Sequence, residues 1–357
     1  MVTWLRSVAR SFDRDERRRL GAFYGVIVLL HLVGWGLLLT YGADRPAFAG
    51  LGFIAYTFGL RHAFDADHIA AIDNATRKLL QERRRPLGVG FFFSIGHSLV
   101  VLLIALLLAL AVRTVVQDLV GGGGQLHDLG GLVGTAVSSL FLISIGLLNL
   151  TVLVDTARAL RRLRVGTDPQ PEPPAALPPA GVLTWLFGRL FRLVDASWKL
   201  LPIGFLFGLG FDTATEMGLL GISAGAAARG LSFTAVLALP IVFAAGMSLV
   251  DTTDGAFMAK AYAWAFSNPI RRLLYNLTVT TLSVFVAVFV GVVEAIQILA
   301  HVLGLQGRLW TLVAGLDFEA LGLVIVVVFA LTWAGSFAAY RLARVEAGTE
   351  RGPSPGG

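Results

Sequence analysis

Five ionisable residues lie within eight positions of one apolar stretch: Arg61, His62, Asp65, Asp67 and His68. A charged side chain at bilayer depth costs about 2.5–3.5 kcal/mol on insertion scales, so such a group inside a membrane span indicates function. On a helix with about 100° per residue, His62, Asp65 and His68 fall within roughly a 120° arc and can face one cavity. Asp67 joins them if the helix is locally unwound; otherwise it orients an imidazole as a hydrogen-bond acceptor.

This combination of side chains predicts a transition-metal site. Imidazole with carboxylate suits nickel, cobalt, zinc and iron, whereas magnesium and calcium prefer oxygen ligands alone. The chain has no cysteine, which excludes disulfides and thiolate ligands. We therefore expect a site made of nitrogen and oxygen atoms.

Three other apolar stretches carry polar residues that we expect to face the same pathway. The third predicted span holds a histidine, and the fifth holds two acidic residues one helical turn apart. The sixth holds two aspartates on one face. These further candidate ligands are His97, Asp212, Glu216, Asp251 and Asp254.

Other polar residues near these spans are weaker candidates. Asp73 and Asn74 are expected to cap the end of the second span near the membrane surface. His31, in the first span, and Phe64, between His62 and Asp65 in the second, could reach similar depth and influence the choice of ion. An additional imidazole should favour nickel over cobalt. The alternative for His31 is a hydrogen-bonded packing residue.

The composition predicts an all-α integral membrane protein. The 357 residues are 56% hydrophobic and 15% charged, with a mean hydropathy of +0.75. A spanning helix needs about 20 mainly apolar residues. Eight segments qualify: residues 22–41, 50–72, 87–112, 131–154, 200–222, 232–258, 275–303 and 318–340.

The basic residues predict the topology of one transmembrane domain over residues 1–357. They gather in a basic N-terminus (1–20), a proline-rich loop (156–199), a tail (341–357) and the second and sixth loops, whereas the alternate loops hold only Arg45, Arg113, Arg229 and Arg308. By the positive-inside rule, both termini are expected in the cytoplasm. The net charge of +6 therefore marks topology, and nucleic acid is not an expected partner.

An internal repeat relates predicted spans two and three to spans five and six. Residues 93–100 and 243–250 share the pattern Phe-x-x-Gly-x-Ser-Leu-Val, and residues 58–60 and 207–209 both read Phe-Gly-Leu. The two copies enter the membrane from opposite sides, so the repeat is inverted. Inverted repeats are common in secondary transporters, which bind substrate near the midplane where the halves meet. Chance similarity, given the many glycines and phenylalanines, is the alternative.

The run Arg-His-Ala-Phe-Asp-Ala-Asp-His-Ile, residues 61–69, resembles the signature of the nickel/cobalt transporter family. Residues 94–98, 209–216 and 246–254 are similar to that family's other motifs. The resemblance covers essentially the whole chain. It implies eight spans and high-affinity uptake of Ni²⁺ or Co²⁺, as substrate, across the bacterial cytoplasmic membrane. It also places His62, Asp67 and His68 at the centre of metal recognition, supported by the acidic and histidine residues of the other motifs.

The sequence argues against several other functions. Exporters of these metals commonly carry a histidine-rich loop that this chain, with six histidines, lacks, so uptake is favoured over efflux. A membrane enzyme, such as an acyltransferase with a His/Asp pair, would need its site at the membrane surface, so we expect no enzyme and no cofactor. No lysine follows the glycine pattern of a phosphate-binding loop, so no ATP-binding motif is present.

Overall fold

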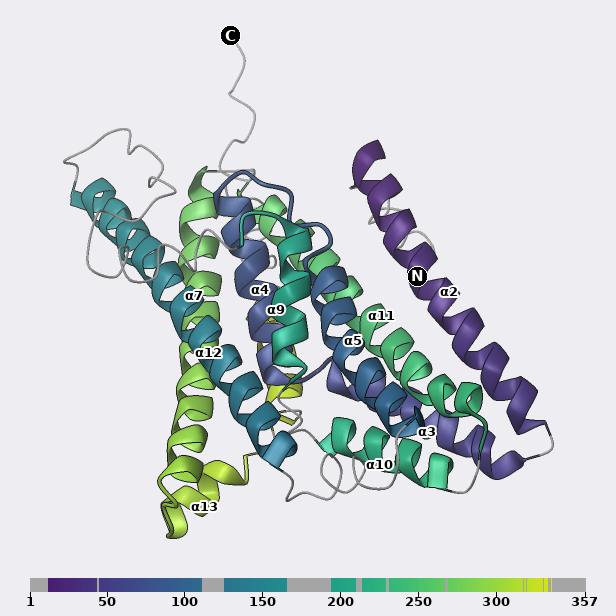
Figure 1. The fold of residues 1–357 in the computed structure, drawn as a ribbon. Coiled ribbons are helices and arrows are strands. Elements are labelled where there is room, and N and C mark those ends of the chain that lie inside the picture. Colours follow the sequence, from purple (N-terminus) through teal and green to yellow (C-terminus); the bar gives the residue numbers. More distant parts are fainter. Residues whose placement is uncertain are drawn as a thin grey trace.

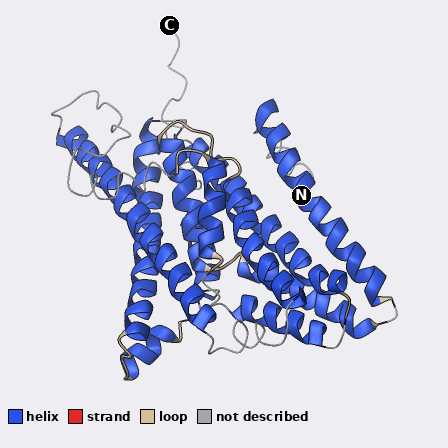
Figure 2. Cartoon of the chain, in the orientation of Figure 1, coloured by secondary structure: helices blue, strands red, loops and turns tan. Residues whose placement is uncertain are grey.

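The computed structural model describes residues 12–43, 45–110, 125–165, 194–209, 214–228, 231–266, 269–316, 318, 320–329, 331–332 and 335. Within these residues every regular element is a helix (Figure 2), so the predicted all-α class is confirmed. The elements are α2 (Arg14–Gly42), α3 (Pro46–His62), α4 (Ala66–Gln81), α5 (Val89–Leu110), α7 (Gln125–Val165), η1 (Ser197–Lys199), α9 (Leu200–Phe207), α10 (Ala214–Ala228), α11 (Phe233–Phe266), α12 (Pro269–Val302) and α13 (Arg308–Ala314). A further apolar helix covers Ala320–Phe329.

Several helices are suited to a lipid environment. Four of them, α2, α5, α11 and α12, are long and apolar enough to cross a membrane by length and composition. On α2, the side chains of Leu32 and Leu39 are 67% and 68% exposed, which fits contact with lipid rather than water. The chain is thus built as a multi-span membrane protein, while the number of eight spans stays a prediction.

Local sequence explains where the first helices begin. Asp13 caps α2 by accepting from the Glu16 amide, and the Glu16 side chain accepts from the Asp13 amide in return. Pro46 starts α3 at a position where no amide donor is needed. Asp65 caps α4, because its backbone is extended and its carboxylate accepts from the Ala66 amide at 2.8 Å.

The second and fifth predicted spans are each divided into two helices rather than continuous. The second becomes α3 and α4, separated by residues 63–65. The fifth becomes α9, which ends in a turn at Gly208 and Leu209, and α10. The cause in the second span is the cap at Asp65, which starts a new helix instead of extending the first.

Helix α4 lies at the centre of the bundle (Figure 1) and packs against α11, α12, α7 and α5. Thirteen of its residues are buried, although its sequence is rich in polar side chains. Asp73 and Asn74 are fully buried in its middle, so the expectation that they cap a helix near the membrane surface is wrong. The helix continues to Gln81 because its polar groups are enclosed by neighbouring helices.

Glycines permit close contacts between the helices that carry the later motifs. Gly59 of α3 lies against the backbone of Phe243 in α11, and a Cβ added there would lie 2.8 Å from the Phe243 carbonyl carbon. Gly204 of α9 lies in the same way against the backbone of Phe93 in α5. These contacts bring the backbone of α3 against that of α11, and the backbone of α9 against that of α5.

The Gly59→Ala variant should therefore destabilise the protein. The added methyl group meets main-chain atoms of α11, which cannot move aside as a side chain can, so the free energy of unfolding should fall by about 1–3 kcal/mol. Thermal unfolding of the purified protein in detergent measures this. Gly36→Ala is the matched control, because Gly36 on α2 has open space around it. Equal unfolding temperatures for the two variants would contradict the close contact.

Candidate metal centre

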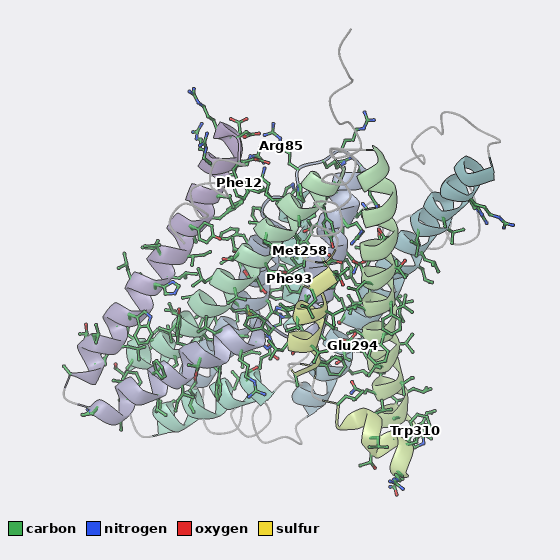
Figure 3. The ribbon with its side chains drawn as sticks, turned by 180° about the vertical axis from the view of Figure 1, so that it is seen from behind. Phe12, Arg85, Phe93, Met258, Glu294 and Trp310 are labelled. Carbon is green, nitrogen blue, oxygen red and sulfur yellow. The ribbon has the colours of Figure 1, made fainter. Side chains whose placement is uncertain are left out.

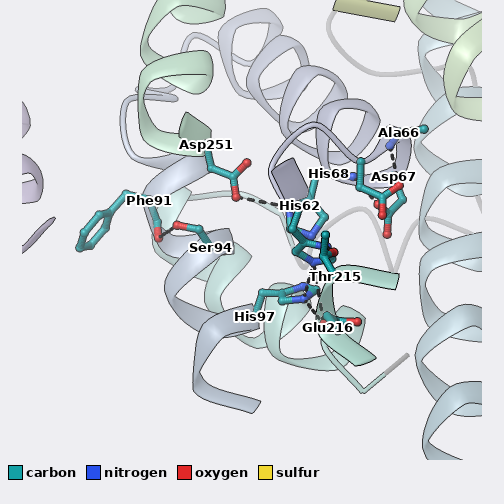
Figure 4. A network of polar contacts seen from close by, with 11 residues as sticks. His62, Ala66, Asp67, His68, Phe91, Ser94, His97, Thr215, Glu216 and Asp251 are labelled. Carbon is teal, nitrogen blue, oxygen red and sulfur yellow. Dashed lines mark hydrogen bonds and ion pairs between the residues drawn. The ribbon is translucent and has the colours of Figure 1, made fainter. Parts of the chain in front are cut away.

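Three buried histidines from three helices converge at the interruption between α3 and α4 (Figure 4). His62 is the last residue of α3, His68 lies in the first turn of α4, and His97 lies in α5. One nitrogen of each lies within 4.8 Å of those of the other two. We name His62, His68 and His97 the histidine cluster.

The distances in this cluster suit a shared cation. The Nε2 atoms of His62 and His97 are 3.0 Å apart, and Oε1 of Glu216 in α10 lies 2.7 Å from His97 Nε2 and 3.8 Å from His62 Nε2. Two ligand atoms at right angles around a metal, each at about 2.1 Å, are about 3 Å apart. Glu216 therefore belongs to the same site as the two imidazoles.

The other ring nitrogens have partners that orient the imidazoles. Thr215 Oγ1 lies 3.1 Å from His62 Nδ1, so the hydroxyl fixes that ring with Nε2 facing the cluster. Asp251 Oδ2 lies 3.3 Å from His68 Nδ1. His68 Nε2 is buried and has no hydrogen-bond partner among the described residues. A carboxylate or hydroxyl on one nitrogen, with the other nitrogen free, is the usual arrangement of a metal-binding histidine.

Aromatic rings and helix ends surround the cluster. Phe93 meets the His68 ring edge to face, with centroids 4.8 Å apart, and Phe243 lies 5.6 Å from the His62 ring. His62 lies at the C-terminal end of α3, where helix carbonyl groups carry partial negative charge that favours a cation. The surroundings therefore exclude water while the helix end and Glu216 supply the negative potential.

The remaining predicted ligands have different positions. Asp65 and Asp67 accept hydrogen bonds from the amides of Ala66 and His68, at 2.8 and 2.7 Å, so both stabilise the start of α4. Asp254 lies one turn after Asp251 on α11. Asp212 lies outside the described residues.

The two residues considered for ion choice have different surroundings. His31 Nδ1 lies 2.8 Å from the Ile27 carbonyl and its Nε2 lies 3.2 Å from the Tyr56 hydroxyl of α3. The backbone of Phe64 lies against Gly322, where no larger residue fits without a shift. No sequence motif indicates Gly322, because its contact joins positions far apart in the chain.

Comparisons with known proteins identify the family of the chain. A family model described as high-affinity nickel-transport protein matches residues 48–339. The nickel transporter NicT of Mycobacterium tuberculosis is 48% identical, over 94% of this chain and 92% of its own. The nickel transporter NixA of Staphylococcus aureus is 46% identical, over 93% and 97%, and the cobalt transport protein NhlF of Rhodococcus rhodochrous is 42% identical, over 92% and 94%. No solved structure matches.

The Thr215→Val variant tests whether the hydroxyl on His62 matters for metal binding. Valine has nearly the same shape but cannot hydrogen-bond to Nδ1, so Ni²⁺ affinity should fall roughly 10–100-fold. Thr215→Ser keeps the hydroxyl, so its Ni²⁺ affinity should be close to that of the unchanged protein. Calorimetric titration of the purified protein gives both affinities, and a valine variant that binds like the serine variant would contradict the proposed orientation.

Proposed function

Because this chain belongs to the high-affinity nickel-transport protein family, we propose that it takes up nickel and cobalt ions across the cytoplasmic membrane. The observation that carries this proposal is the histidine cluster, buried at a helix interruption inside an apolar bundle. The family is one of transporters, so the chain is not an enzyme.

The charge and ligand types of the site fit a divalent transition metal. Three imidazoles supply nitrogen, and Glu216 and Asp251, when ionised, bring two negative charges that match one divalent cation. A divalent ion at this depth without such counter-charges would be very costly. Relatives named for nickel and for cobalt both match over nearly the whole chain, which supports both ions as substrates.

The distribution of charge supports cytoplasmic termini. Arg85 lies at one end of the molecule with the start of α2, and Trp310 lies at the opposite end (Figure 3). At the first end, Lys260 binds Glu16 at 2.5 Å and Arg85 lies 3.4 Å from Asp15. We name this the basic end. By the positive-inside rule, we assign it to the cytoplasm.

The packing of the glycine motifs supports the inverted repeat. Gly96 of α5 meets the backbone of Phe205 in α9, and Gly246 of α11 meets the backbone of Tyr56 in α3. These are equivalent pairs under the offset of the repeat. In each case the first helix of one copy packs on the second helix of the other, and both copies have a first span divided in two.

This arrangement gives a mechanism in which the two copies share the ion. The first copy contributes the histidine cluster, and the second contributes Thr215, Glu216 and Asp251. A site at the boundary of two inverted halves can open to either side when one half tilts against the other. Transport then requires no ATP site in the chain.

Loss of one ligand should abolish uptake. His62→Ala or His68→Ala removes an imidazole and leaves its buried partners uncompensated, so accumulation of radioactive nickel should fall to the level of cells without the protein. His301→Ala is the control, because His301 is exposed at the end of α12. Normal uptake by a well-expressed His62→Ala variant would contradict the site, and nickel loss from cells expressing the unchanged protein would indicate efflux instead.

Labelling of single cysteines tests the topology in this cysteine-free chain. Arg85→Cys at the basic end should react with a membrane-impermeant maleimide only after the cells are opened. Gln306→Cys, which is exposed near α13 at the opposite end, should react in intact cells. The reverse pattern would invert the proposed orientation.

A further inference from the structure

A second group of buried polar residues lies between the histidine cluster and the basic end. It consists of Asp73 and Arg77 of α4, Tyr262 of α11, and Thr280 and Ser283 of α12. All five are buried. We name them the inner polar cluster.

Arg77 is held in this cluster by uncharged groups. Its guanidinium donates to Thr280 at 2.6 Å, to Ser283 at 2.6 Å and to the Tyr262 hydroxyl at 2.7 Å. No carboxylate of the described residues lies within ion-pair distance of it, and its Nε has no partner there. Tyr262 donates its own hydroxyl proton to Asp73, so the phenol stands between the cation and the acid.

A row of carboxylates joins this cluster to the histidines. Asp251 lies 3.3 Å from His68, and Asp254 follows it by one turn on α11. Gly255, next to Asp254, lies against the Ile72 side chain, next to Asp73, so Asp254 and Asp73 occupy neighbouring positions of α11 and α4. Each of the three has one buried oxygen without a hydrogen-bond partner among the described residues. Buried carboxylate oxygens of native proteins normally have partners, so three in a row point to a ligand that supplies them.

We propose that Asp254 and Asp73 form a second binding station for the transported divalent cation, and that Arg77 is a tethered cation that closes it toward the basic end. The proposal rests on the proposed function, which supplies the ion. Arg77 follows Asp73 by one helical turn on α4, within reach of the same carboxylate. A metal ion and the guanidinium therefore compete for Asp73.

The ligand types give this station its role. Nickel and cobalt bind imidazole more strongly than carboxylate oxygen, so an oxygen-only station receives the ion from the histidine cluster and holds it less tightly. Arg77 repels the arriving divalent ion. As the ion leaves, the guanidinium pairs with the Asp73 carboxylate in its place. The same side chain thus blocks free passage and assists release.

The test uses the full-length protein with the histidine cluster disabled by His62→Ala, His68→Ala and His97→Ala. Ni²⁺ binding is measured by equilibrium dialysis in detergent, so that only the remaining station is observed. Adding Arg77→Gln removes the competing charge, and the residual Ni²⁺ affinity should rise roughly tenfold or more. Arg77→Lys keeps the charge and should not raise it, whereas Asp73→Asn should abolish residual binding.

Two further variants separate the electrostatic role from a merely structural one. Tyr262→Phe removes the phenol that competes for Asp73 and should also tighten Ni²⁺ binding, which keeps the test valid if Arg77→Gln does not fold. Glu294→Gln is the control, because Glu294 is a buried carboxylate of α12 that accepts from Ser138 at 2.8 Å; residual binding should not change.

Contrary results are readily recognised. The second station would be overturned if Asp73→Asn left the residual Ni²⁺ binding unchanged. Equal Ni²⁺ affinities for Arg77→Gln and Arg77→Lys would overturn it as well. An unaltered affinity in Tyr262→Phe would do the same. The proposed function has a separate readout, since it fails if the protein with an intact histidine cluster neither binds nor accumulates Ni²⁺ or Co²⁺.

Discussion

The interior of a membrane offers no water to a polar side chain, and this constraint governs helix α4 and everything packed around it. Its polar groups must find partners on other helices. Arg77 finds three hydroxyls on α11 and α12, Asn74 accepts from Asn149 of α7 at 2.7 Å, and Lys78 donates to the Val194 carbonyl at 2.5 Å. These bonds hold the bundle around α4, and they also leave the His68 end of the helix facing the centre of the protein.

The interruption of the second span converts a linear motif into a three-dimensional site. On one continuous helix, His62 and His68 would lie about 120° apart. With α3 ending at His62 and α4 starting at Ala66, their ring centroids are 4.7 Å apart. Asp65 and Asp67, which lie between the two histidines, stabilise this arrangement because their carboxylates accept hydrogen bonds from the first amides of α4. The density of charged residues in the motif is therefore explained in part by the formation of a helix start inside the bundle, beside the proposed metal site.

The sequence was informative wherever the signal was local. Apolar runs predicted the helices, and the polar residues His62, His68, His97 and Glu216 stood out because charge is costly in such runs. The sequence was misleading at Asp73, where a polar pair after an apolar stretch is typical of a helix end. Asp73 is buried in the middle of α4 instead, where the distant Tyr262 hydroxyl donates to it, and contacts of that sequence separation have no local pattern. The contact of Gly322 with Phe64 is of the same kind.

High affinity and rapid release make opposite demands on one site, and the helix interruption reconciles them. A site formed on a single rigid helix could lose its ion only by breaking strong nitrogen–metal bonds against fixed ligands. Here His62 and His68 belong to separate helices, and Glu216 to a third segment in the other half of the chain. A change in the angle at residues 63–65, or between the halves, would move the proposed ligands apart at the same time. The affinity of the site then depends on the conformation of the protein, so the spacing of the same side chains can favour capture on one side and weaker binding on the other.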